Sequence, residues 1–226
     1  MRLLLVRHGQ SPSNVAHLLD TQVPGPALTD VGREQAQALV GLLGDEGIGL
    51  VTSSPQTRAR QTAAPLAAAL GLDVEVVEGL EEIAAGELEM RGDEPAVRAY
   101  LGVVGSWLTG DLDVPMPGAA DGNAFFARYD AAVERVVARA RELGAGVAVA
   151  TSHGAAIRCW TGVRVRNLSA EYVVATGLLN TGCVALEGEP ETGWTATSWM
   201  GAALDPERAE AAGAGPAGEP ATPSVF

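Results

Sequence analysis

Two histidines stand directly after apolar runs of the chain, and each is followed by glycine. His8 follows residues 3 to 6 with Arg7 in between, and His153 comes two residues after the run GVAVAT, residues 146 to 151. A neutral imidazole can attack phosphorus as a nucleophile. An arginine fork binds phosphate through paired, charge-assisted hydrogen bonds. Glycine lets the backbone approach a ligand closely. These residue types together predict phosphoryl chemistry.

Further charged residues follow two other apolar runs. Arg58 lies one turn into the helix expected after residues 48 to 52, and Glu81 and Glu82 follow residues 74 to 77 after a short loop. A carboxylic acid can protonate the oxygen of a departing alcohol. Taken singly, each of these residues is more often a structural or surface residue. Their order, and their positions after successive apolar runs, make them candidates for one site.

The elements that must position these residues alternate between strand and helix. The four apolar runs have the length of strands, and patterns of helical period separate them. This alternation predicts an α/β fold with a mostly parallel central sheet. Ligands of such sheets bind beyond the carboxyl ends of the strands. If the four strands are neighbours, the two histidines, the two arginines and a carboxylate meet at one edge.

Helix signals flank the first half of this pattern. Thr29 is a good N-cap for the helix expected from Asp30 onward, and the acidic side chain of Asp30 suits the first helical turn. Ser54 and Pro55 are expected to open the next helix as its cap and first residue. Pro65 is then expected to kink or interrupt that helix.

The second half of the chain is less regular. Helices are expected over residues 94 to 109, over residues 123 to 143 and from Ala155 onward, and late strands over residues 181 to 186 and 195 to 200. The Ala-, Gly-, Pro- and Glu-rich residues 205 to 226 predict a disordered tail. Met90, Trp107 and Met116 either line the mouth of a pocket or form a local core.

The composition excludes several classes of function. The formal net charge of −13 argues against nucleic acid or an anionic membrane as a partner. The chain contains no lysine, which excludes a P-loop lysine and Schiff-base chemistry. Cys159 and Cys183 stand apart and predict buried thiols rather than a metal site. No apolar run reaches membrane-spanning length and no signal peptide is recognised, so we expect a cytoplasmic protein.

The motifs resemble those of the histidine phosphatase superfamily, which includes the cofactor-dependent phosphoglycerate mutases. VRHGQSPSN resembles its opening motif, SSPQTRARQTA its second, LEEIAAGELE the segment that carries its acid, and TSHGAAIR its second histidine motif. LLNTGCVALE resembles a late strand of these proteins. The resemblance covers residues 1 to about 200.

The resemblance implies a role for each matching position. His8 would become a phosphohistidine, and Glu82 would serve as the general acid and then as the base that activates water. Glu81 is adjacent, and a shift of one position would exchange the two. The remaining implied residues hold the phosphoryl group: Arg7, Asn14, Arg58, His153 and Gly154. No metal or cofactor is implied, and the charge of Arg7 is expected to help keep His8 neutral.

The family also implies a three-layer α/β/α fold with a small helical cap, here at about residues 85 to 122 of one domain over residues 1 to 204. The chain departs from the family pattern in two places: PGAADGN replaces a PGGES-like stretch, and Gln10 stands where an acidic residue is usual. Mutases also surround their substrate with lysine. We therefore expect a phosphatase that acts on a small phosphate monoester.

Two alternatives stay open. The first is a phosphoglycerate mutase-type phosphotransferase, and the second is a non-enzymatic module that binds a phosphate ligand. The sequence predicts neither the identity of the substrate nor the oligomeric state.

Overall fold

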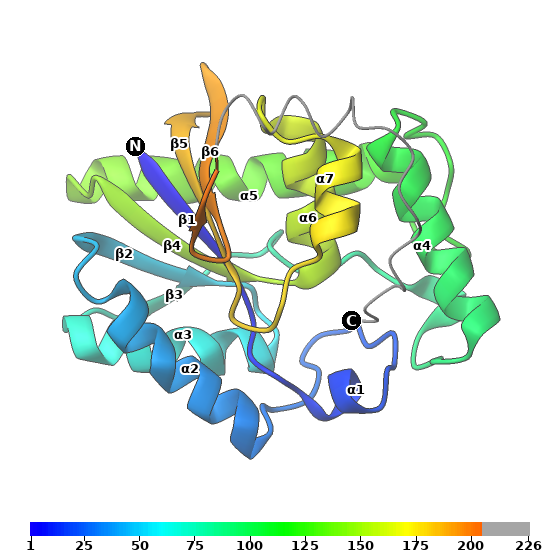
Figure 1. Ribbon diagram of the computed structural model, residues 1–226, viewed down its shortest axis with the longest axis horizontal. Coiled ribbons are helices and arrows are strands. Elements are labelled where there is room, and N and C mark those ends of the chain that lie inside the picture. Colours follow the sequence, from blue (N-terminus) through cyan, green and yellow to red (C-terminus); the bar gives the residue numbers. More distant parts are fainter. Residues whose placement is uncertain (205–226) are drawn as a thin grey trace.

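The computed structural model describes residues 1 to 204 and is built around one sheet (Figure 1). The strands are β1 (Arg2–Arg7), β2 (Ile48–Ser53), β3 (Val74–Val76), β4 (Val147–Ser152), β5 (Cys183–Glu189), β6 (Gly193–Trp199) and β7 (Ala202–Ala203). Their order across the sheet is β3-β2-β4-β1-β5-β6-β7. The first four strands in this order run parallel, and β5, β6 and β7 each pair antiparallel with the preceding strand. The prediction of a mostly parallel core is confirmed.

The parallel strands end at a common edge because their registers match. Arg7 at the end of β1 pairs with Ser152 at the end of β4, and Ser53 at the end of β2 pairs with Thr151. The next residues in the chain are His8, His153 and Ser54. The sheet therefore brings together three segments that are far apart in the sequence.

Helices cover both faces of the sheet. They are α1 (Pro12–Val15), α2 (Asp30–Leu43), α3 (Thr57–Leu70), α4 (Glu94–Leu108), α5 (Gly122–Leu143), α6 (Gly154–Arg164) and α7 (Ala170–Thr176), with a short 3-10 helix η1 (Gly86–Leu88). Among the described residues, no helix has both the length and the apolar character needed to cross a membrane.

Alternation along the strands divides the core into two layers. Leu3 and Leu5 of β1 pack with the apolar faces of α4, α5 and α6. Leu4 and Val6 face the opposite side, where α2 and α3 supply Leu39 and Leu66, among others. Successive side chains of a strand point to opposite faces, so an unbroken apolar strand fits a sheet that is covered on both sides. Figure 1 shows α2 and α3 on one side and α5 and α6 on the other.

The expected start of the second helix was wrong. This helix begins at Thr57, and its N-cap Gln56 makes no side-chain capping bond. The Ser54 hydroxyl instead contacts His153 Nε2 at 2.7 Å and donates to Gln56 Oε1 at 2.9 Å. Ser54 is bound to the second histidine and is therefore not free to cap the helix.

Of the two effects expected at Pro65, the interruption was wrong, because α3 runs through this residue from Thr57 to Leu70, and the kink stays a prediction. Proline removes one backbone hydrogen bond from a helix. The buried residues Ala59, Ala63 and Leu66 hold α3 against the sheet and α2. Their burial offsets the lost bond.

The segment between β3 and α5 contains η1 and α4. Trp107 and Met116 are buried within the core on this side, and Met90 is exposed. None of the three lines the pocket that contains Arg7 and His8. The predicted disordered tail, residues 205 to 226, lies outside the described residues.

Two leucines of α2 provide a test of the layered core. Leu39 is buried, whereas Leu42 is 70 % exposed, and both lie in the same helix. We expect Leu39→Ala to lower the free energy of unfolding by about 2 to 5 kcal/mol, because it leaves a cavity under the sheet. The matched control Leu42→Ala should change it by less than about 0.5 kcal/mol. Urea denaturation measures both, and equal effects would contradict this packing.

Candidate active site

Backbone contacts fix the position and the ring orientation of His8. Its N–H donates to the carbonyl of Ser152 at 3.0 Å, and its ring Nδ1 lies 2.7 Å from the carbonyl of Gly9. A carbonyl only accepts, so Nδ1 carries the proton and the lone pair of the ring lies on Nε2. Gly9 is required here because a Cβ would lie 2.6 Å from the carbonyl oxygen of Gly32. The strand end thus presents one defined tautomer of His8.

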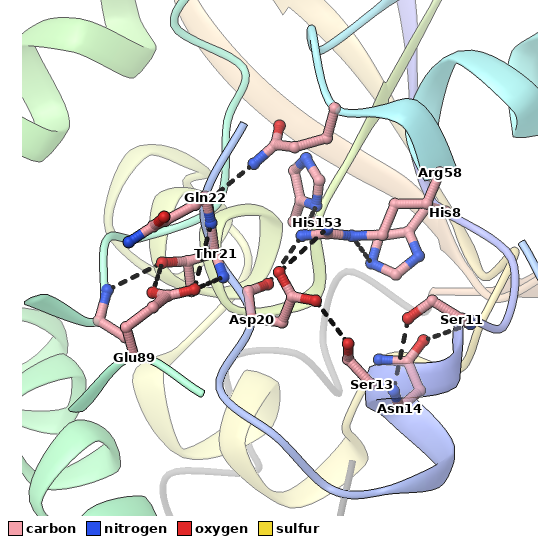
Figure 2. Close-up of polar contacts among 12 residues, drawn as sticks. His8, Ser11, Ser13, Asn14, Asp20, Thr21, Gln22, Arg58, Glu89 and His153 are labelled. Atoms are coloured by element: carbon pink, nitrogen blue, oxygen red, sulfur yellow. Dashed lines mark hydrogen bonds and ion pairs between the residues drawn. The ribbon is translucent and has the colours of Figure 1, made fainter. Parts of the chain in front are cut away.

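Arg58 joins the two histidines. Its Nε donates to His8 Nε2 at 3.1 Å, and its Nη2 lies 3.3 Å from His153 Nδ1 and donates to the Asp20 carbonyl at 3.0 Å. Nη1 is buried and has no hydrogen-bond partner among the described residues. Figure 2 shows the guanidinium of Arg58 between the two imidazoles and Asp20.

His153 has the opposite tautomer. Its Nδ1 accepts from Arg58, so its Nε2 carries the proton and donates to the Ser54 hydroxyl. Ser54 donates in turn to Gln56, whose Nε2 donates to the carbonyl of Thr21 at 3.1 Å. This chain of hydrogen bonds fixes the ring of His153 and connects it to the loop after α1.

The site keeps both imidazoles neutral. Burial lowers the pKa of His8 well below its usual value, and the charges of Arg58 and then Arg7 lower it further. Burial and Arg58 are also the main causes that lower the pKa of His153. The expected effect of Arg7 on His8 is therefore present but is smaller than that of burial. A neutral His8 is the form that can act as a nucleophile.

Arg7 lies beside His8 with part of its guanidinium unpaired. Its Nη1 donates to the carbonyl of Leu178 at 2.6 Å, and its buried Nε has no partner among the described residues. Burial lowers the pKa of Arg7 to about 10, a value at which the side chain is still charged at neutral pH. A Cβ on Gly154 would lie 3.1 Å from Nε of Arg7, so glycine leaves the space that this group needs.

The structure separates the two candidate carboxylates. Glu82 lines the same pocket as Arg7 and His8, and its oxygens accept from the backbone N–H groups of Ala155 at 3.1 Å and Ala156 at 2.7 Å. These donors belong to the first turn of α6, which attracts negative charge. Glu81 is instead paired with Arg128 at 2.8 Å and does not line this pocket.

Asn14 holds the short helix α1 beside His8. Its Oδ1 accepts from the backbone N–H of Ser11 at 3.0 Å and from Nδ2 of Asn180 at 3.2 Å. Asn180 also donates to the His8 carbonyl at 3.0 Å. The sequence reading did not single out Asn180, because only the pairing of β5 with β1 brings it to this edge.

The predicted site residues line one pocket of about 70 Å³, together with residues that the sequence reading missed. Of the predicted set, Arg7, His8, Asn14, Arg58, Glu82 and Gly154 line its wall, and His153 lies directly behind Arg58. The further lining residues include His17, Asp20, Thr21, Val97 and Tyr100. His17 was left out because its polar loop suggested no partner.

The missed residues gave no local signal because distant contacts place their loop. Glu89 accepts from the N–H of Thr21 at 2.7 Å and from its hydroxyl at 2.5 Å. Leu19 N donates to the carbonyl of Arg91, and Met90 N donates to the carbonyl of Leu19. Figure 2 shows Thr21 and Glu89 on the side of the site away from Asn14.

The described residues contain no group of three or more metal-ligating side chains close enough to share an ion. Cys159 and Cys183 are free thiols, and burial raises the pKa of each to about 12. The metal-free mechanism stays a prediction.

Comparison with known proteins identifies the family to which the chain is similar. The model of the histidine phosphatase superfamily (branch 1) matches residues 3 to 200. The PE-PGRS family protein PE_PGRS11 of Mycobacterium tuberculosis is 40% identical over 215 residues, which are 89% of this chain but only 36% of that protein. The adenosylcobalamin/alpha-ribazole phosphatase of Escherichia coli is 33% identical over 142 residues, covering 63% of this chain and 68% of the relative.

A solved structure with the same fold is also a phosphatase. The mycobacterial glucosyl-3-phosphoglycerate phosphatase superposes with a TM-score of 0.72 at 26% identity, covering 89% of this chain and 99% of that one. The chain belongs to the histidine phosphatase superfamily. Its named phosphatase relatives support an enzyme that hydrolyses phosphate esters.

The protonation states of the two histidines can be measured directly. We expect long-range ¹H–¹⁵N NMR at pH 6 to show neutral imidazoles in the folded protein, protonated on Nδ1 in His8 and on Nε2 in His153. Both pKa values are lowered on folding, so the unfolded state takes up protons first. The contribution of these groups to stability should then fall as the pH drops below about 6.5.

The urea-unfolded chain is the control, and its histidines should titrate near their usual value of about 6.5. A folded-state spectrum in which His8 or His153 is half protonated at pH 6.5 would contradict the proposed electrostatics.

Proposed function

We propose that this protein is a phosphomonoester hydrolase that works through a phosphohistidine at His8 on a small phosphorylated metabolite. The observation that carries the proposal is the unprotonated Nε2 of His8, whose hydrogen-bond partner is Arg58. The carbonyl of Gly9 fixes the tautomer, and the partner of Nε2 is a guanidinium that can also bind a phosphate oxygen.

In the first step, His8 Nε2 attacks phosphorus and the bond from phosphorus to the ester oxygen breaks. The departing alkoxide takes the proton of the Glu82 carboxylic acid. Oε2 of Glu82 is the better placed oxygen, because its one hydrogen bond within the described region comes from Ala155, whereas Oε1 accepts two. In the second step, the Glu82 carboxylate takes a proton from water, the water oxygen attacks phosphorus, and the N–P bond breaks.

The clamp on the phosphoryl group would be formed by Arg7 and Arg58, with Asn14 and the backbone at Gly154 completing it. His153 would support the clamp by accepting from Arg58, because its own ring N–H donates to Ser54. Nε of Arg7 and Nη1 of Arg58 favour this role, since they are buried donors without an acceptor among residues 1 to 204. Preorganised positive charge stabilises the transition state without rearrangement during the reaction.

We further propose that residues 85 to 122 form a cap on a single domain of residues 1 to 204. Val97 and Tyr100 of α4 lie in the wall of the pocket, which supports this assignment. The organic part of the substrate would contact these residues. A small-molecule ester, rather than nucleic acid or a membrane, and a cytoplasmic location stay predictions.

Hydrolysis is favoured over mutase-type transfer by the charges of the pocket. A mutase must hold a second anionic group of its substrate. The arginines that line this pocket are Arg7 and Arg58, and both are assigned to the transferred phosphoryl group. The pure binding module is disfavoured because the nucleophile and a carboxylate lie in the same cavity.

Glu82→Gln tests the acid role, because the amide keeps the shape of the side chain but cannot protonate an alkoxide. For a sugar phosphate, the rate of the phosphorylation burst should fall by roughly 10²- to 10⁴-fold. For p-nitrophenyl phosphate the burst rate should fall much less, because p-nitrophenolate leaves without a proton. Rapid-quench measurement of the burst separates this step from the later attack of water.

Glu81→Gln is the matched control, and it should leave both burst rates within a few-fold of the wild type. Equal losses for both substrates in Glu82→Gln would remove Glu82 from the acid role. A selective loss in Glu81→Gln would assign that role to its neighbour.

A further inference from the structure

Asp20 places a carboxylate in the wall of the same pocket. Its side chain is 9% exposed, and Oδ1 lies 3.9 Å from Nη1 of Arg58, which is itself 3% exposed. Oδ2 accepts from the hydroxyl of Ser13. Figure 2 shows the carboxylate between Arg58 and Ser13. Asp20 is therefore a second acid, besides Glu82, that lines the cavity.

The carboxylate of Asp20 still has unused capacity to accept hydrogen bonds. An ionised carboxylate offers about four acceptor sites. Within residues 1 to 204 it receives one hydrogen bond, from Ser13, and the distance to Arg58 is too long for a second. The carboxylate of Glu89 accepts more hydrogen bonds, from the N–H and hydroxyl of Thr21 and from the N–H of Gln22.

Without a substrate, the charges of the arginine and carboxylate side chains that line the pocket cancel. Arg7 and Arg58 contribute two positive charges, and Asp20 and Glu82 contribute two negative ones. Protonation of Glu82 for its acid role leaves one net positive charge, which the phosphate dianion already exceeds. Among the described residues that line this pocket, no arginine besides Arg7 and Arg58 could receive a second anionic group, and His17 is the one further basic side chain apart from His8.

Neighbouring arginines do not supply the missing charge. Arg158 donates to the carbonyls of Val173 and Val174, and Arg128 is paired with Glu81 and donates to backbone carbonyls. Neither lines the pocket.

We propose that Asp20 is a specificity-determining residue that excludes substrates with a second anionic group beside the transferred phosphate. The same carboxylate accepts a hydrogen bond from a hydroxyl or ammonium group of the organic part. The substrate class is then a phosphate monoester with a neutral or cationic, hydroxyl-bearing body. This inference rests on the proposed function, since it assumes that the phosphate binds beside His8.

Two three-carbon esters isolate the effect of charge. Glycerol 3-phosphate and 3-phosphoglycerate differ in one terminal group, a hydroxymethyl in the first and a carboxylate in the second. We expect wild-type kcat/KM to favour glycerol 3-phosphate by roughly ten- to a hundredfold, the scale expected for two like charges a few ångströms apart. Asp20→Asn, which keeps the size of the side chain, should reduce this ratio about tenfold or more, mainly through KM for 3-phosphoglycerate.

Direct binding separates this inference from the chemistry. Calorimetric titration of both esters into His8→Ala and into His8→Ala/Asp20→Asn should show the same change in the ratio of Kd values without turnover. Asp30→Asn is the matched control: Asp30 is an exposed acid of α2 whose carboxylate pairs with Arg33, and its removal should leave the ratio unchanged.

An unchanged ratio in Asp20→Asn, or equal weakening of both esters, would overturn the specificity role and leave the hydrolase intact. The second pattern would show that Asp20 only positions Arg58. If neither ester bound and no monoester were hydrolysed, both this inference and the proposed function would be wrong.

Discussion

The guanidinium of Arg58 is buried between two imidazoles, and the other groups of the site are arranged around that contact. Burying a charge is costly unless it is compensated. Here the compensation comes from His8, His153 and the Asp20 carbonyl, each of which accepts from Arg58 or lies within 3.3 Å of it. The strand order β2-β4-β1 is what allows this, because α3 follows β2 while the two histidines follow β1 and β4.

The same contact connects structure with reactivity. The positive charge of Arg58 adds to burial in keeping both rings neutral, and the carbonyl of Gly9 leaves the lone pair of His8 on Nε2. Without substrate, that lone pair accepts the Nε–H of Arg58. A phosphate oxygen is a stronger acceptor for this N–H because it is charged. In the proposed mechanism, binding of the substrate therefore releases the nucleophile.

The sequence predicted the parallel core, most of the helices and the strand-end positions of His8 and His153, because apolar runs and helical periodicity are local signals. The choice of Glu82 rather than Glu81 as the acid came only from the resemblance. In the structure, Glu82 accepts from the first turn of α6, whereas Glu81 pairs with Arg128. The sequence reading failed at Ser54, whose hydroxyl binds His153 instead of capping α3. Asp20 and Asn180 were missed because loop contacts and strand pairing, not local pattern, bring them to the site.

The central claim is that Nε2 of His8 receives the phosphoryl group. The most direct measurement stops a reaction with a phosphate monoester in base during turnover, then locates the phosphate by peptide mass spectrometry and ³¹P NMR. The mechanism predicts one base-stable phosphohistidine, at His8 and substituted on Nε2. Phosphate on Nδ1, on His153 or on a carboxylate would contradict it, as would turnover in which His8 never becomes phosphorylated.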